Sequence, residues 1–281
     1  MLVFHKVFDI SNYLSKNFQN KATIGFVPTM GALHDGHISI IKKSKAENDI
    51  TVSSIFVNPT QFNNLEDFDK YPKTIGSDIE KLATVKADIL FLPEVDEMYP
   101  HGTEYNVSFD VGYLDTVMEG AFRPGHFKGV AQIVKRLLDI VQPDNLYLGQ
   151  KDYQQFMVVK KMINDLQFPV NLIMAPTIRE SDGLAMSSRN MRLNETARKN
   201  ASLLYAILQQ AATDIKTLSI ADATKKAMNS LEQIPDTQPE YIAFADAETL
   251  EPLTRYFPEK KTVICIAAWV GGVRLIDNII L

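Results

Sequence analysis

Apolar runs and amphipathic stretches alternate along the first half of the chain and somewhat beyond it. Short apolar runs that end at polar or proline residues predict buried strands at 22–28, 51–57, 89–93, 145–148 and 170–175. Apolar residues on one helical face predict helices at 37–47, 75–85, 130–141 and 153–166. This alternation is typical of a parallel sheet with crossover helices. Ligands of such sheets bind at the carboxyl ends of the strands.

The pattern changes after Pro176. Gly271 and Gly272 separate two apolar runs near the end of the chain, which indicates a hairpin. We therefore expect a Rossmann-like parallel-sheet domain at 1–176 and a smaller C-terminal α+β domain at 177–281. The second domain is expected to contain helices at 195–213 and 220–231 and strands at 240–246 and 262–269.

Composition narrows the class of protein. The 281 residues include 29 Lys and Arg and 34 Asp and Glu, a formal net charge of −5. This balance argues against a protein built mainly to bind nucleic acid. The single cysteine, Cys265, lies among apolar residues, so we expect a core residue and no disulfide or cysteine-based zinc site. Neither a membrane-length apolar run nor a secretory signal is recognisable, which favours a cytoplasmic protein without a membrane partner.

A histidine-containing segment, PTMGALHDGH, lies between the first predicted strand and the helix that follows it and ends at His37. Gly31 and Gly36 have P-loop spacing, but His37-Ile38 stands where Lys-Ser/Thr is required. His34 and His37 are three residues apart and can face one way. At a helix N-terminus, the two rings could contact phosphates, bind a metal or cap the helix.

Five blocks together resemble a known family. The histidine segment is similar to the HIGH signature of adenylate-forming nucleotidyltransferases. The segment MSSRN resembles their KMSKS signature, with Arg189 in place of the second lysine. The ordered blocks resemble the pantothenate synthetase (pantoate–β-alanine ligase) family from about residue 20 to 192 and more loosely beyond. They lie at 28–37, 55–62, 123–129, 149–155 and 182–190.

The resemblance implies a two-step ligase. ATP and (R)-pantoate would give pantoyl adenylate and pyrophosphate, and the amine of β-alanine would then displace AMP to give pantothenate. It also implies Mg²⁺ alongside the substrate ATP, and a homodimer. The first domain would bind ATP and pantoate, and the second would serve as a lid.

The family's catalytic groups match His34, His37 and Lys151, with His37 expected nearest the reacting phosphate. Gln61 and Gln155 match its two pantoate-binding glutamines. The resemblance assigns no metal ligand to the protein. The positions expected to contact ATP are Met30, Gly31, Ala32, Leu33, His34, Asp35, Gly36, His37, Gly149, Gln150, Lys151, Asp152, Ile178, Met186, Ser187, Ser188 and Arg189.

The chemistry of these residue types suits such roles. A lysine and an arginine can neutralise phosphates, and serine hydroxyls can donate to them. Asp152 would contact either the ribose or the magnesium shell. Each glutamine amide can both donate and accept, as a ligand with hydroxyls and a carboxylate requires. Met30 and Phe62 could form an apolar wall for the pantoate methyls.

Taken singly, the residues also have ordinary structural explanations. Gln61 could be a turn residue, Lys151 and Asp152 a solvated pair, and Ser187 with Ser188 a helix cap. Three alternative functions remain: a transferase that keeps the nucleotide on its product, a nucleotide-binding regulator without turnover, and an RNA-binding protein.

Overall fold

The computed structural model describes residues 1–18, 21–63, 65–102 and 109–281. They form two compact units. The first contains residues 1–149 and 158–176, and the second contains residues 150–157 and 177–281. The short segment 150–157 therefore packs with residues that follow it by more than twenty positions, although it continues directly from a strand of the first unit.

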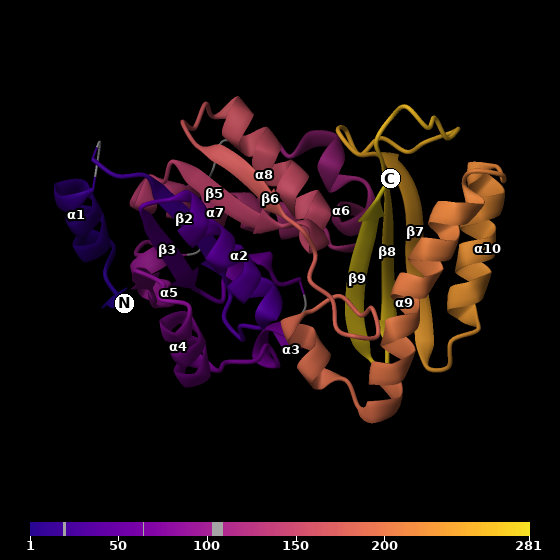
Figure 1. Cartoon of the computed structure of the whole chain (residues 1–281), viewed down its shortest axis with the longest axis horizontal. Coiled ribbons are helices and arrows are strands. Elements are labelled where there is room, and N and C mark those ends of the chain that lie inside the picture. The colour runs from indigo at the N-terminus through magenta and orange to yellow at the C-terminus, as the bar shows by residue number, and fades with distance from the viewer. Residues whose placement is uncertain (19–20, 64, 103–108) are drawn as a thin grey trace. The chain divides into compact units, whose positions relative to one another are not determined.

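The first unit is built on a six-stranded sheet in the order β1-β4-β3-β2-β5-β6, and its pairings are parallel. Figure 1 labels β2, β3, β5 and β6 of this sheet. The five strands expected from the apolar runs are present, and β1 is added at one edge. Their bounds are β1 Leu2–Phe4, β2 Ile24–Thr29, β3 Ile50–Ile55, β4 Ile89–Phe91, β5 Asn145–Gly149 and β6 Asn171–Ala175. The predicted α/β class is confirmed.

Helices connect these strands. The helix expected at 130–141 begins earlier, at His126, directly after Gly125 in the left-handed conformation (φ 80°). Several short helices were not predicted, because each has too few turns to show a periodic pattern. The α-helices are α1 Val7–Asn17, α2 Asp35–Glu47, α3 Leu65–Asp69, α4 Ile75–Thr84, α5 Val95–Met98, α6 Met118–Phe122, α7 His126–Val141 and α8 Tyr153–Asp165. The 3₁₀ turns are η1 Pro59–Gln61, η2 Gly112–Asp115, η3 Gln150–Asp152 and η4 Ser188–Arg192.

The core of the first unit includes a cluster between the sheet and its helices. Val27, Leu90 and Tyr147 come from three strands and pack with Ile41 of α2 and Leu82 of α4. Because strand side chains alternate between faces, the apolar neighbours of these strand residues lie on the opposite side of the sheet. Strands buried on both faces read as continuous apolar runs, which explains why the sequence pattern located them.

The second unit contains an antiparallel sheet β7-β8-β9, with α9 and α10 packed on it (Figure 1). The expected hairpin joins β8 to β9, and Gly271 and Gly272 have φ values of 55° and 74°. Cys265 is buried in β8, as expected. The bounds are α9 Glu195–Asp214, α10 Ile220–Glu232, β7 Thr237–Asp246, β8 Thr262–Val270 and β9 Val273–Ile280.

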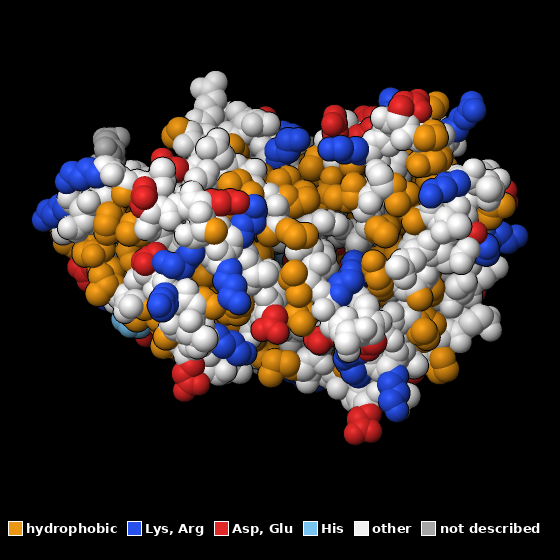
Figure 2. All heavy atoms as spheres, viewed as in Figure 1, with side chains coloured by type: hydrophobic (Ala, Val, Ile, Leu, Met, Phe, Trp, Pro, Cys, Tyr) orange, Lys and Arg blue, Asp and Glu red, His pale blue; other side chains and the backbone are white. Residues whose placement is uncertain are grey.

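Within the residues that the structure describes, no helix is both long enough and apolar enough to cross a membrane. Basic and acidic side chains are interspersed over the face drawn in Figure 2, in keeping with the small net charge.

Candidate active site

The strand order places a switch point in the first unit between β2 and β5. The chain runs outward from β2 to β3 and β4, and later returns to β5 on the other side of β2. Open α/β sheets bind ligands at the carboxyl ends of strands that flank such a point. The histidine-containing segment starts where β2 ends, and η3 with Lys151 starts where β5 ends. Two of the predicted ATP-binding segments therefore begin where two adjacent strands, β2 and β5, end.

The turn after β2 is fixed by helix α4. Gly31 and Ala32 have φ values of 81° and 48°. The fully buried carboxylate of Asp78 accepts the N–H groups of Ala32 (2.9 Å) and Leu33 (2.7 Å). The ammonium of Lys81 donates to the carbonyl of Leu33. Two N–H groups of the expected ATP-binding segment therefore bond to Asp78 within the protein. The turn is held through these two N–H donors and through the carbonyl that accepts from Lys81.

His34 and His37 lie together at the start of α2. Their ring centroids are 4.0 Å apart, and the N–H of His34 donates to Nδ1 of His37 at 3.3 Å. Because Nδ1 accepts this bond, the neutral His37 ring carries its proton on Nε2. The capping alternative is therefore observed for His37, and this bond uses Nδ1 and not Nε2–H. The two roles are compatible.

Gln61 lies at the end of η1, which follows β3. The side chain is buried, and its amide nitrogen lies 3.0 Å from the sulfur of Met30. The sequence placed both residues near the pantoate pocket, and the structure brings them together at the ends of neighbouring strands. Phe62, also expected there, packs on Phe68 and Tyr71, with ring centroids 5.3 and 5.7 Å away.

Asn58 is a buried polar residue within the 55–62 block, but it was not among the predicted site residues. Its amide donates to the carbonyl of Gly129 (3.2 Å) and to the side-chain oxygen of Gln61 (3.4 Å), and its oxygen accepts from Tyr99 (2.7 Å). A Cβ on Gly129 would lie 2.3 Å from the carbonyl oxygen of Thr60, so α7 touches η1 backbone to backbone. Asn58 therefore orients the Gln61 side chain against a rigid support.

His126 supports the same turn, although it was left out of the predicted catalytic set. Its Nδ1 lies 2.8 Å from the carbonyl oxygen of Gln61, which can only accept. Its Nε2 lies 3.1 Å from the guanidinium of Arg123, which can only donate. The ring is therefore neutral, with its proton on Nδ1, and it fixes the backbone of Gln61. The sequence signal was the short motif Arg-Pro-Gly-His, which gives no indication of the partner.

Lys151, Asp152 and Gln155 belong to the second unit. The Lys151 side chain is 17% exposed, and its ammonium lies 3.6 Å from the 48% exposed carboxylate of Asp152. The Lys151–Asp152 pair, which we expected as the ordinary structural explanation of these residues, is thus present. The lysine is much the more buried partner. Gln155 is half-buried on the first turn of α8. Gln61 belongs to the first unit, so the expected meeting of the two glutamines at one pocket stays a prediction.

The segment that resembles the second signature ends a short hairpin. Arg179 and Ala185 form an isolated bridge, and the N–H of Met186 donates to the carbonyl of Ile178 at 3.0 Å. The Ser187 hydroxyl then caps η4 by accepting the N–H of Arg189 at 3.3 Å. The capping alternative therefore holds for Ser187, whose hydroxyl hydrogen can still be donated to a ligand.

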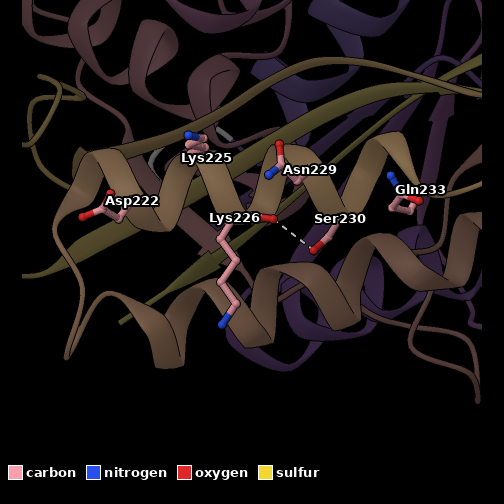
Figure 3. Close-up of a pocket in the computed structure, with 6 residues that line it drawn as sticks. All are labelled: Asp222, Lys225, Lys226, Asn229, Ser230 and Gln233. Atoms are coloured by element: carbon pink, nitrogen blue, oxygen red, sulfur yellow. Dashed lines mark hydrogen bonds between the residues drawn. The ribbon is translucent and has the colours of Figure 1, made fainter.

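A shallow depression of about 370 Å³ lies along α10 (Figure 3). The expected ATP-binding residues do not line it. Lys226 of α10 pairs with Asp214 of α9 at 2.8 Å, which lowers the pKa of that carboxyl. We assign it no ligand. Its lining residues are Asp222, Lys225, Lys226, Asn229, Ser230 and Gln233.

The sheet, its switch point and the histidine turn define a nucleotide-binding α/β protein with a second α+β unit. Residues 2–280 match the model of the pantoate–β-alanine ligase family. The chain belongs to that family.

Named relatives agree with this assignment. Pantothenate synthetase of Cytophaga hutchinsonii is 47% identical over 271 residues, 96% of this chain and 95% of the relative. That of Moorella thermoacetica is 44% identical over 274 residues, 97% and 95% of the two chains. The crystal structure of pantothenate synthetase from Thermus thermophilus superposes with a TM-score of 0.91 at 40% identity, covering 99% of both chains.

A further solved structure carries ligands. Pantoate–β-alanine ligase from Francisella tularensis, complexed with beta-gamma ATP and beta-alanine, is 38% identical. It superposes with a TM-score of 0.83 and covers 99% of this chain and 97% of that one.

Proposed function

We propose that this chain catalyses the ATP-dependent condensation of (R)-pantoate with β-alanine to give pantothenate, AMP and pyrophosphate. The observation that carries the proposal is membership of the pantoate–β-alanine ligase family over residues 2–280. The relative crystallised with an ATP compound and β-alanine supports ATP as a substrate. The histidine turn at the switch point supplies the matching chemistry.

In the first step, a pantoate carboxylate oxygen attacks the α-phosphorus of ATP. The bond from that phosphorus to the bridging oxygen breaks, and pyrophosphate leaves. His37 Nε2–H would donate to phosphate oxygens as their charge grows, with His34 beside it. Lys151, Ser187 and Arg189 would bind the phosphates as a point charge, a hydroxyl donor and a planar cation. A half-buried lysine suits this role, because its charge is less screened than on an open surface.

Magnesium would enter with the nucleotide. Among the described residues, no three His, Cys, Asp or Glu side chains are grouped to hold a metal ion. Mg²⁺ commonly binds through substrate phosphates, water and one or two carboxylates, so the exposed Asp152 fits as a contributor. When bound, the ion would neutralise phosphate charge.

In the second step, the β-alanine amine attacks the acyl carbon of pantoyl adenylate, the carbon–oxygen bond to AMP breaks, and the ammonium proton is lost. Gln61 and Gln155 would bind pantoate, with Met30 and Phe62 beside its methyl groups. An acyl adenylate must be kept from water. We propose residues 1–176 as the ATP- and pantoate-binding domain and 177–281 as the lid. A homodimer and a cytoplasmic location complete the proposal.

Pyrophosphate release tests the function directly. The protein is incubated with ATP, Mg²⁺ and pantoate, with and without β-alanine. A stoichiometric burst that becomes sustained AMP and pantothenate formation on adding β-alanine is the expected result. Release that is indifferent to β-alanine would favour a transferase that keeps the nucleotide on its product. Nucleotide binding without any release would favour a regulator.

Replacing Gln155 with alanine is expected to raise the KM for pantoate about 5- to 150-fold and leave the KM for ATP within about twofold. One lost amide removes hydrogen bonds to the pantoate hydroxyls or carboxylate, which are worth about 1–3 kcal/mol. Steady-state kinetics with each substrate varied in turn measures both constants. Gln209→Ala, an exposed change on α9, is the control. A loss of ATP affinity instead would assign Gln155 to the nucleotide.

A further inference from the structure

Strand β9 contacts the backbone that carries Lys151. Asn278 is 2% exposed, and its side-chain amide donates to the carbonyls of Gln150 (2.9 Å) and Lys151 (2.8 Å). Its oxygen accepts from the side chain of Gln150 at 3.2 Å. One side chain therefore makes three hydrogen bonds to the turn that carries the proposed phosphate-binding lysine. All these residues belong to the second unit.

The preceding residue contacts the other ATP-binding segment of this unit. Asp277 is 4% exposed and pairs with Arg179 through two bonds of 2.6 and 3.0 Å. The same guanidinium donates to the carbonyls of Gly183 (3.1 Å) and Asn278 (3.3 Å) and lies 3.6 Å from the ring centre of Tyr205. The hairpin that leads to Met186–Arg189 is thus tied to β9 through Arg179, which also bonds within the hairpin to Gly183.

The alternation of a β-strand explains how two adjacent residues reach two segments. Asn278 pairs with Cys265 and Asp277 with Ile266 across the β8–β9 ladder. Consecutive residues of a strand point to opposite faces of the sheet. Ile266 belongs to the core beneath α9, the helix that carries Tyr205. Asp277 therefore lies on the α9 face, where the hairpin is, and Asn278 lies on the opposite face, where η3 is.

We propose that Asp277 and Asn278 are positioning residues for ATP. From one strand, β9, they hold the Lys151 turn and the Met186–Arg189 segment in a fixed position relative to each other. This inference rests on the proposed function of those two segments. Phosphate-binding groups contribute only when they are held within a fraction of an ångström, and a misplacement of 1 Å can cost about a hundredfold in rate. The buried Asn278 amide, which donates to two carbonyls of the lysine turn, provides that constraint.

The test uses Asn278→Asp and Asn278→Ser in the full-length protein. The aspartate keeps the size of the side chain but sets a carboxylate against the two carbonyls, and the serine keeps only one donor. We expect kcat for pyrophosphate release with ATP and pantoate to fall about 10- to 100-fold. We expect the KM for ATP to rise as well. Asn278→Ser should lose less activity than Asn278→Asp.

Arg274→Gln is the matched control. Arg274 also lies on β9, near the β8–β9 turn, and makes a two-bond ion pair with Glu240 of β7 at 2.9 and 2.6 Å. It should lower the melting temperature and leave kcat unchanged per folded molecule. If both Asn278 variants resemble Arg274→Gln, with a lower melting temperature and an unchanged kcat, then Asn278 has only a structural role and the proposal is wrong. If the wild-type protein itself releases no pyrophosphate, the proposed function fails first, which separates the two results.

Discussion

Replacing His37 with alanine is expected to lower the rate of pantoyl adenylate formation about 10²–10³-fold. The change removes the Nε2–H donor that the bond from the His34 N–H to Nδ1 keeps in place. Loss of one well-placed donor to a developing negative charge typically costs this much. Single-turnover pyrophosphate release with saturating ATP and pantoate measures the step directly. An unchanged rate would show that His37 is only a helix cap.

A second substitution separates the donor from the cap. A glutamine at position 37 can place an amide N–H near the former Nε2 position, so His37→Gln should retain more activity than His37→Ala. His5→Ala is the control, because His5 is exposed, follows the edge strand β1, and bonds through its ring to the carbonyl of Leu92. Equal losses in the alanine and glutamine variants would argue against a donor role.

Much of the fold could be predicted because its signals are local. Strands of a parallel sheet are buried on both faces, so β2 and β5 appear as apolar runs in any window of the sequence. The Gly271-Gly272 hairpin depends on two adjacent residues that adopt positive φ. β1 was missed because three residues at a sheet edge, with Leu2 and Val3 exposed, are too few to form a pattern.

The supporting residues of the candidate site could not be predicted, because their partners are distant in the sequence. Asn58 and Gly129 are 71 positions apart, and Asn278 lies 127 positions from Lys151. A strand pattern marks Asn278 only as a polar residue near the end of the chain. Family blocks located the residues that would touch substrate, but the residues that hold them are defined by tertiary contacts.

Asp78 is the supporting residue whose loss should affect the protein most. Asp78→Ala is expected to lower the free energy of unfolding by roughly 2–6 kcal/mol. The N–H groups of Ala32 and Leu33 lose a charged acceptor, and each buried N–H left unpaired costs about 1–3 kcal/mol. Urea unfolding, compared at equal m-values, measures the change.

The same carboxylate should also affect catalysis through the histidine turn. Asp78→Asn keeps the shape of the side chain but turns one amide N–H toward a backbone N–H, so the turn must shift. We expect kcat for adenylate formation to fall at least tenfold under conditions in which the variant is fully folded, since sub-ångström placement of His37 is lost. Glu80→Gln makes the same chemical change two residues along α4 at an exposed position and should leave stability and rate unaltered. If Asp78→Asn lost stability but kept the full rate, the histidine pair would hold its geometry without α4, and the capping bond between His34 and His37 would be sufficient on its own.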